Sequence, residues 1–175
     1  NEFAAALQDL GVEEDDVVTL YLPMIPELPV AMLSCARIGA PHSVVFAGFS
    51  ADALAERMDD ADSEYLITCD GYYRRGAPVH QKSKADNAAI DLERDVTTVV
   101  VDRLGDGTPL TDGERDYEQL IATHRGETVE PVARDATDQL FLIYTSETTG
   151  EPAGVRQTTG GYLSHVAWTS RAVLD

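Results

Sequence analysis

Short, continuously apolar runs alternate along this chain with longer segments in which apolar residues recur every three or four positions. Runs of the first kind predict buried strands, and the chain has five, Val17–Pro23, Ser43–Gly48, Glu64–Asp70, Thr97–Asp102 and Gln139–Ser146. Segments of the second kind predict helices over residues 25–40, 51–61, 117–125 and from about Gly161 onward. The alternation predicts an α/β fold, a mostly parallel sheet with helices on both faces.

Local signals refine the helices and the positions where ligands would bind. The helix over residues 25–40 rests on Val30, Leu33, Ala36 and Arg37, which are spaced by threes and fours. Ser50 is a good N-cap for the helix that follows it. In a parallel sheet, ligands bind beyond the carboxyl ends of the strands. The segments after Ser146 and around residues 46–49 are therefore candidate binding turns.

Both ends of the chain indicate that it is a segment of a longer protein. Asn1 is not a start methionine, and the residues after it look like the second half of a helix. Asp175 follows another helix with no capping turn. We therefore expect residues 1–175 to form part of one domain, truncated at both ends.

The charge is strongly negative, with 31 acidic and 13 basic residues and a formal net charge of −18. Such a surface repels nucleic acid and anionic membranes. Only Lys82 and Lys84 are lysines, and acidic, lysine-poor chains suit cytosols at molar salt, where charge repulsion is screened within roughly 3 Å. This composition favours a salt-loving source over an acidic partner-binding surface.

The remaining composition indicates a cytoplasmic protein without a structural metal. No apolar run is long enough to cross a bilayer, and the first residues lack a signal-peptide pattern. Cys35 and Cys69 each lie in an apolar segment, which predicts buried, reduced thiols. The four histidines are scattered singly, without the spacing of metal ligands.

The stretch FLIYTSETTGEPAGV, residues 141–155, is the clearest chemical signal. Four hydroxyls within five residues can donate to phosphate oxygens, and glycines permit turns that aim backbone N–H groups at an anion. The stretch is not a Walker loop, because GxxxxGK[ST] is absent. From these residues alone, a phosphate-binding loop and a Ser/Thr-rich surface turn both remain open.

This stretch resembles the TSG[ST]TGxPKG signature of the adenylate-forming superfamily. Four further stretches resemble its AMP-forming acetyl-CoA synthetases in the same order and spacing: Tyr21–Ser50, Ile67–Val79, Phe141–Ser146 and Gln157–Leu163. The resemblance covers nearly the whole chain and implies that the fold belongs to the large N-terminal domain of such an enzyme.

The resemblance also implies substrates and site residues. Enzymes of this family join a carboxylate to ATP, release pyrophosphate, and pass the acyl group to coenzyme A. Phe46, Gly48 and Arg74 match positions that contact coenzyme A, and Arg75 lies two residues before Ala77, which stands where the family has a second arginine. ATP would arrive with Mg²⁺, and its β- and γ-phosphates would lie against Thr145, Ser146, Glu147, Thr148, Thr149, Gly150, Glu151, Pro152, Ala153 and Gly154.

Arginine suits a phosphate because its planar guanidinium binds two oxygens at once. An ordinary solvated arginine pair is the alternative interpretation of Arg74 and Arg75.

The loop departs from the family pattern at three positions. Glu147 replaces glycine, Glu151 replaces the commonest lysine, and Ala153 replaces another lysine. A carboxylate about 4 Å from a phosphate charge costs roughly 4 kcal/mol at an effective dielectric constant of 20. These changes predict weak ATP binding or slow adenylate formation.

Three functional hypotheses follow. The first is a piece of an acetate–CoA ligase, whose partners are ATP, acetate, coenzyme A and the remainder of the ligase chain. Because the family's acetate pocket and adenylation lysine lie downstream of this loop, we expect the 175 residues alone to be inactive. The second is a degenerate, non-catalytic relative that binds a nucleotide, coenzyme A or a partner chain. The third is a ligase for propionate or another short-chain acid.

Overall fold

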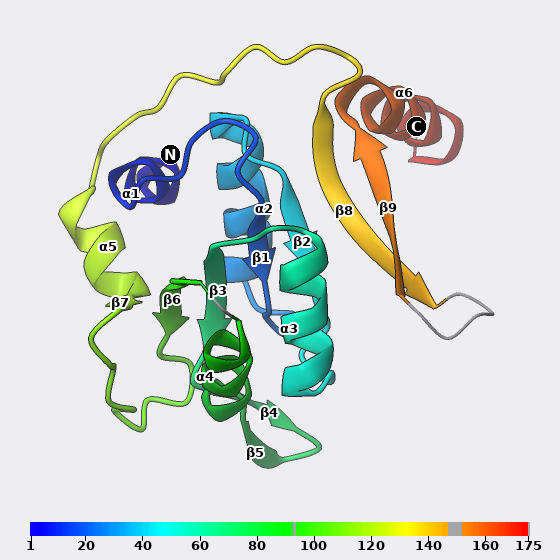
Figure 1. The fold of residues 1–175 in the computed structure, drawn as a ribbon. Coiled ribbons are helices and arrows are strands. Elements are labelled where there is room, and N and C mark those ends of the chain that lie inside the picture. Colours follow the sequence, from blue (N-terminus) through cyan, green and yellow to red (C-terminus); the bar gives the residue numbers. More distant parts are fainter. Residues whose placement is uncertain (93, 147–151, 175) are drawn as a thin grey trace.

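In the computed structural model, which describes residues 1–92, 94–146 and 152–174, a seven-stranded sheet forms the centre of the molecule (Figure 1). The strand order is β7-β6-β3-β1-β2-β8-β9. All neighbouring strands pair in parallel except β8 and β9, which are antiparallel. The strands are β1 (Val18–Leu20), β2 (His42–Val44), β3 (Tyr65–Cys69), β6 (Thr97–Val101), β7 (Glu114–Asp116), β8 (Gln139–Ser146) and β9 (Pro152–Thr158).

Helices cover both faces of the sheet, as the sequence predicted. They are α1 (Glu2–Asp9), α2 (Glu27–Ile38), α3 (Ala51–Asp60), α4 (Lys82–Asp91) and α5 (Tyr117–Thr123). A further helix, α6 (Thr159–Thr169), follows β9 and continues as one turn of π-helix, η1 (Ser170–Leu174). A separate two-stranded hairpin consists of β4 (Gly71–Arg74) and β5 (Ala77–His80).

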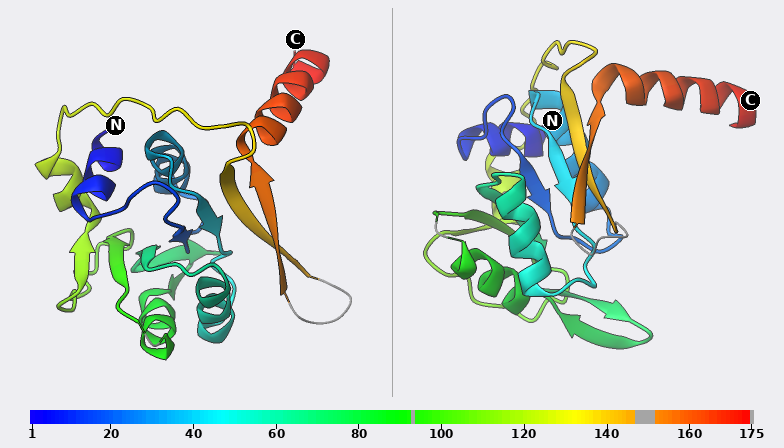
Figure 2. Two further views of the ribbon diagram at one scale, coloured as in Figure 1. Left: turned by 45° about the horizontal axis from the view of Figure 1, so that its top comes forward. Right: turned by 45° about the vertical axis from the view of Figure 1, so that its right-hand side comes forward.

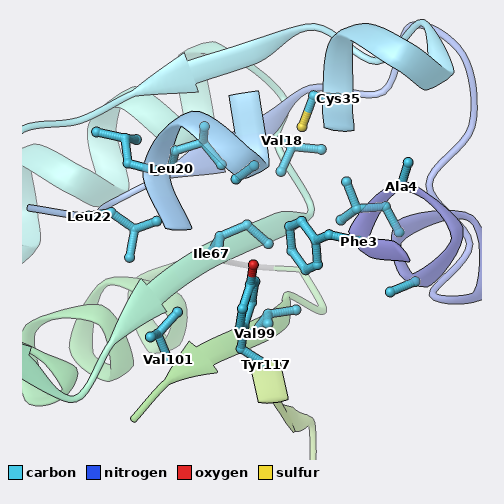
Figure 3. Close-up of a cluster of buried hydrophobic side chains, with 14 of the residues drawn as sticks. Phe3, Ala4, Val18, Leu20, Leu22, Cys35, Ile67, Val99, Val101 and Tyr117 are labelled. Atoms are coloured by element: carbon cyan, nitrogen blue, oxygen red, sulfur yellow. The ribbon is translucent and has the colours of Figure 1, made fainter. Parts of the chain in front are cut away.

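Two hydrophobic cores lie on opposite faces of the strands. The first core joins α1, α2 and α5 to the sheet, and Figure 3 shows Phe3 and Tyr117 meeting there, with their ring centroids 4.8 Å apart. The second core lies under α3 and α4. Neighbouring residues of β3 serve different cores, because Ile67 belongs to the first and Leu66 to the second. This alternation is what a strand buried on both faces requires.

The five predicted strands are all present, and the structure adds elements that the sequence pattern did not show. These are the β4–β5 hairpin, α4, β7 and β9. Strand β9 has the sequence PAGVRQT, whose proline, glycine and arginine weaken any strand signal. Strand β9 forms because it pairs with β8 from Pro152 to Thr158.

Helix α2 confirms the predicted helix but buries a different face. Val30 is 41% exposed and Leu33 is 71% exposed. The buried side chains are Leu28, Ala31, Ser34, Cys35 and Ile38. Apolar residues lie on more than one face of α2. Their spacing alone therefore does not identify the face that packs on the sheet.

The C-terminal helix begins slightly earlier than predicted. Helix α6 starts at Thr159, and its N-cap is Thr158, whose hydroxyl accepts a hydrogen bond from the Gly161 N–H at 3.4 Å. Helix α6, which is described in full, contains no buried residue. It extends away from the sheet at the end of the β8–β9 hairpin (Figure 2).

A long connection, residues 124–138, crosses from α5 to β8 (Figure 1). Arg37 of α2 holds it by donating to the Val129 carbonyl at 2.7 Å, and the Val132 N–H donates back to the Arg37 carbonyl at 2.9 Å. Arg134 further along forms ion pairs with Glu14, Asp15 and Asp138. Arginines thus fix the path that brings the chain to the far side of the sheet.

Candidate functional site

Three of the segments singled out from the sequence leave the sheet at its carboxyl edge. The turn at residues 46–49 follows β2, the β4–β5 hairpin follows β3, and the predicted phosphate loop follows β8. Figure 1 shows these strands pointing the same way, with the hairpin and the end of β8 beyond their arrowheads. Parallel pairing therefore places the turn, the hairpin and the end of β8, where the predicted phosphate loop begins, at the edge where ligands bind in such sheets.

The turn at residues 46–49 is held from beneath by Tyr21. The Tyr21 hydroxyl donates to the Phe49 carbonyl at 2.7 Å and lies 3.3 Å from the Ala47 carbonyl. Burial raises the pKa of Tyr21 to about 12, so this hydroxyl remains a donor at neutral pH. Phe46 is 63% exposed, and its ring meets the edge of Phe49 at 5.8 Å. Gly48 is exposed, with open space around its Cα.

The β4–β5 hairpin presents two arginines at its tip. Arg75 and Gly76 form a two-residue turn with φ values of 52° and 81°, the left-handed backbone of a tight hairpin. Arg74 and Arg75 are both exposed, and neither forms an ion pair within the part of the chain that the structure describes. Two guanidiniums at one tip can therefore meet an anion without first breaking a pair.

Asp70 holds the root of this hairpin. Its buried carboxylate accepts hydrogen bonds from the backbone N–H groups of Gly71 at 2.7 Å, Arg103 at 2.8 Å and Leu104 at 3.0 Å. A methyl group on Gly71 would lie 2.5 Å from the Val79 carbonyl oxygen, so only glycine fits there without a shift. The hairpin thus has a fixed starting point at the end of β3.

The end of β8 carries the first residues of the predicted phosphate loop. Thr145 is exposed and opposite Ala153 in the antiparallel ladder, and Ser146 is opposite Pro152. The predicted residues Glu147, Thr148, Thr149, Gly150 and Glu151 lie outside the described residues, and their role stays a prediction.

Gly154 has a different purpose from the one expected. It lies within β9 rather than in a left-handed turn. A methyl group there would lie 3.1 Å from the ring of Tyr144, its cross-strand partner. Glycine at this position therefore lets the ring approach closely, whereas a methyl group would require a small shift of the ring.

Tyr144 connects β8 to α3. Its hydroxyl donates to Asp60 Oδ2 at 2.7 Å and lies 3.3 Å from the Arg57 carbonyl oxygen. Partial burial, together with the Asp60 carboxylate, raises the pKa of Tyr144 above its ordinary value. The hydroxyl therefore stays protonated and keeps donating. This contact was not predicted, because nothing in the sequence links positions 60 and 144.

An apolar cavity of about 300 Å³ lies beside these segments. Its lining includes Met32 and Leu33 of α2, His42 of β2 and Phe141 of β8. His42 is only 4% exposed, and its ring stacks on Phe141 with centroids 5.5 Å apart. Neither ring nitrogen has a hydrogen-bond partner among the described residues. Burial lowers the pKa of His42 to about 4, so the ring is neutral at pH 7.

The two cysteines are buried and free, as the sequence predicted. Burial raises the pKa of each thiol to about 12, which makes them unreactive. Over the described ranges, His, Cys, Asp and Glu side chains form no cluster of three or more that could hold a metal ion. Within the same ranges, no helix is long and apolar enough to cross a membrane.

A mostly parallel sheet with helices on both faces and candidate binding segments at its carboxyl edge places the chain among the α/β proteins that bind ligands at that edge. The chain belongs to the AMP-binding enzyme family, whose profile matches residues 1–174. This match confirms the adenylate-forming resemblance found in the sequence.

The chain is similar to several acetyl-coenzyme A synthetases. It is 48% identical to the one from Streptomyces avermitilis over 98% of this chain and 26% of that protein. It is 44% identical to the one from Methanothrix thermoacetophila, over 100% of this chain and 27% of that protein. Acetyl-coenzyme A synthetase 2 of Saccharomyces cerevisiae is also 44% identical, over 100% and 26% respectively. The chain thus spans about a quarter of the length of these relatives.

A solved structure shares the fold. The acetoacetyl-CoA synthetase from Streptomyces lividans superposes with a TM-score of 0.88 at 29% identity, covering 97% of this chain and 26% of that one. The mostly parallel sheet flanked by helices is therefore an arrangement found in an acyl-CoA synthetase.

His42 should make the folded state sensitive to mild acid. The unfolded chain binds a proton near pH 6.5 and the folded chain only near pH 4, so stability falls as the pH drops below 6.5. Between pH 7 and pH 4.5 this group alone should cost about 2 kcal/mol of unfolding free energy. The His42→Leu variant should lose that part of the pH dependence in urea unfolding. The exposed His80→Leu control should not, and equal pH profiles for the parent and His42→Leu would contradict the account.

Proposed function

We propose that this chain is part of an acetate–CoA ligase that forms acetyl-CoA, AMP and diphosphate through an acetyl-adenylate. The observation that carries the proposal is the position of three segments, the turn at residues 46–49, the Arg74–Arg75 tip and the end of β8 at Thr145–Ser146, at one sheet edge. Membership of the AMP-binding family and the similarity to acetyl-coenzyme A synthetases support it.

In this proposal the β8–β9 connection holds the ATP phosphates. Exposed Thr145 offers a hydroxyl at its start, and Gly154 ends the segment opposite Tyr144. The residues of the loop are Thr145, Ser146, Glu147, Thr148, Thr149, Gly150, Glu151, Pro152, Ala153 and Gly154. Mg²⁺ arriving with ATP neutralises charge on the phosphates.

Coenzyme A would lie across the other two segments. The exposed ring of Phe46 offers an apolar face for part of the cofactor, and Gly48 leaves space beside it. Arg74 and Arg75 supply cations for its phosphate groups, in a chain whose net charge of −18 otherwise repels them. Acetate and the adenylation chemistry belong to the remainder of the ligase, so we expect residues 1–175 alone to be inactive.

A second candidate is a degenerate, non-catalytic relative. Glu147, Glu151 and Ala153 favour it, because two carboxylates and a missing lysine weaken the attraction for a triphosphate. The acid also stays open, and propionate or another short-chain acid is an alternative to acetate. The shared fold of the Streptomyces lividans acetoacetyl-CoA synthetase supports keeping that alternative.

The setting that we propose is a cytoplasm at molar salt. Acidic residues outnumber basic ones by 31 to 13, and lysine is almost absent. At roughly 1 M salt the Debye length is about 3 Å, which reduces both self-repulsion and the penalty of Glu147 and Glu151 against phosphate.

The loop glutamates provide the test between the working ligase and its degenerate alternative. In molar KCl, we expect the whole protein to catalyse acetate-dependent exchange between ATP and pyrophosphate. A Glu147→Gly, Glu151→Lys, Ala153→Lys variant should be faster, by about 10-fold for each restored favourable contact of 1.4 kcal/mol. No exchange in the parent with recovery in the variant would support the degenerate alternative. No exchange with acetate but exchange with propionate would reassign the acid.

The hairpin arginines provide a separate test of coenzyme A binding. Losing a charge-assisted contact to phosphate costs about 1.5–3 kcal/mol, so Arg74→Ala and Arg75→Ala should each raise the KM for coenzyme A by at least 10-fold. The rate of ATP–pyrophosphate exchange, which needs no coenzyme A, should not change. Arg103→Ala, which removes an arginine outside the hairpin, is the control. An unchanged KM in both hairpin variants would favour the solvated-pair interpretation.

A further inference from the structure

Arg57 in the last turn of α3 lies between two aromatic rings. Its guanidinium carbon is 4.7 Å from the ring centroid of Phe49 and 5.5 Å from that of Tyr144. Its Nη1 donates to the Ala53 carbonyl of the same helix at 2.6 Å. In a chain with a net charge of −18, Arg57 takes part in none of the ion pairs among the described residues. The rings therefore provide its main partners, as in a cation–π contact.

Each ring belongs to a different part of the candidate site. Phe49 closes the turn that presents Phe46, and Tyr21 holds the Phe49 carbonyl. Tyr144 directly precedes Thr145, the first residue of the predicted phosphate loop. A single side chain thus contacts both the segment proposed for coenzyme A and the strand proposed for ATP.

The backbone fixes these two segments only loosely to each other. Strand β8 pairs with β2 at just two positions, His42 with Phe141 and Ser43 with Leu142. Tyr144 lies beyond them, where β8 is paired with β9. Phe49 lies beyond the end of β2, in the turn. Beyond these pairs, side chains of α3 contact both the end of β8 and the turn.

Helix α3 does this from two sides. The Arg57 guanidinium packs on the ring of Tyr144, while Asp60 and the Arg57 carbonyl oxygen lie within 2.7 Å and 3.3 Å of its hydroxyl. Gly154 leaves space for the ring on the opposite strand. Ser50 starts α3 directly after the turn, by accepting from the Ala53 N–H at 3.2 Å. The helix is therefore attached at its start to the turn and at its end to β8.

We propose that Arg57 is a positioning residue that holds the coenzyme A turn and the ATP strand in one fixed arrangement. The proposal rests on the proposed function, because it assigns Arg57 a part in both half-reactions. A planar guanidinium can lie against two ring faces at once, which an ammonium group on a flexible stem cannot do equally well. Arg57 touches neither substrate in this account and acts through Phe49 and Tyr144.

The test uses the whole protein with the variants Arg57→Met and Arg57→Lys. Arg57→Met keeps much of the side-chain length and loses the cation. We expect it to raise the KM for ATP in pyrophosphate exchange and the KM for coenzyme A in thioester formation together, each by about 10-fold. Arg57→Lys keeps the cation and should show a smaller rise in both.

Arg94→Met is the matched control. Arg94 also holds α3, by donating to the Met58 carbonyl at 2.8 Å and pairing with Asp62 at 3.1 Å, but it contacts neither ring. Its loss should leave both KM values unchanged. A purely structural role of Arg57 would instead lower the thermal midpoint and leave both KM values of the folded enzyme unchanged.

Hydrogen exchange provides a readout that does not require activity. In Arg57→Met the amides of residues 46–49 and 142–145 should exchange faster, while those of β3 should not change. Faster exchange in only one segment, or a change in only one KM, would overturn the proposed coupling. A parent protein without ligase activity would contradict the proposed function. The hydrogen-exchange pattern would still decide the role of Arg57. If Arg57→Met fails to fold, Arg57→Lys still tests the coupling, because a smaller rise in both KM values together is expected, and a rise in only one would overturn it.

Discussion

Parallel pairing of the strands determines where the proposed ligand-binding segments lie. Because β3, β1, β2 and β8 run in one direction, the segments that follow β2, β3 and β8 all begin at one edge of the sheet. Two hydrophobic cores, one on each face, stabilise this parallel sheet. The side chains proposed to bind ligands lie on a short turn and a hairpin, while burial of the neighbouring strands supplies the stability.

The negative net charge of the chain opposes binding of anionic ligands at the proposed site, and only a few arginines offset it locally. A chain with a net charge of −18 binds two phosphate-rich ligands in the proposed function. Exposed Arg74 and Arg75 provide positive charge at one position of the edge, whereas the loop after β8 contains Glu147 and Glu151. Other arginines hold the fold together, since Arg37 and Arg134 fasten the crossing segment. In the proposed function, this distribution of charge predicts a weaker attraction for ATP than for coenzyme A.

The fold class and the central strands could be predicted from the sequence, because burial on both faces leaves continuous apolar runs such as 139–146. The Ser50 cap could also be predicted, since its signal is local. Strand β9 and the hairpin could not, because their glycines and prolines weaken the strand signal and each strand depends on its pairing partner. The contacts of Tyr144 with Asp60 and Arg57 join positions more than 80 residues apart, for which one sequence carries no signal. Gly154 was expected to turn the chain, and only the ring beside it explains why glycine stands there.

In the proposed function, ATP and coenzyme A bind at separate segments of the carboxyl edge of this sheet. Hydrogen exchange of the whole protein in molar KCl, with MgATP or coenzyme A added, distinguishes the two positions. MgATP should protect residues 144–155, and coenzyme A should protect residues 46–49 and 71–80. Protection by both ligands only at positions away from this edge, or by neither ligand anywhere, would contradict the proposed positions.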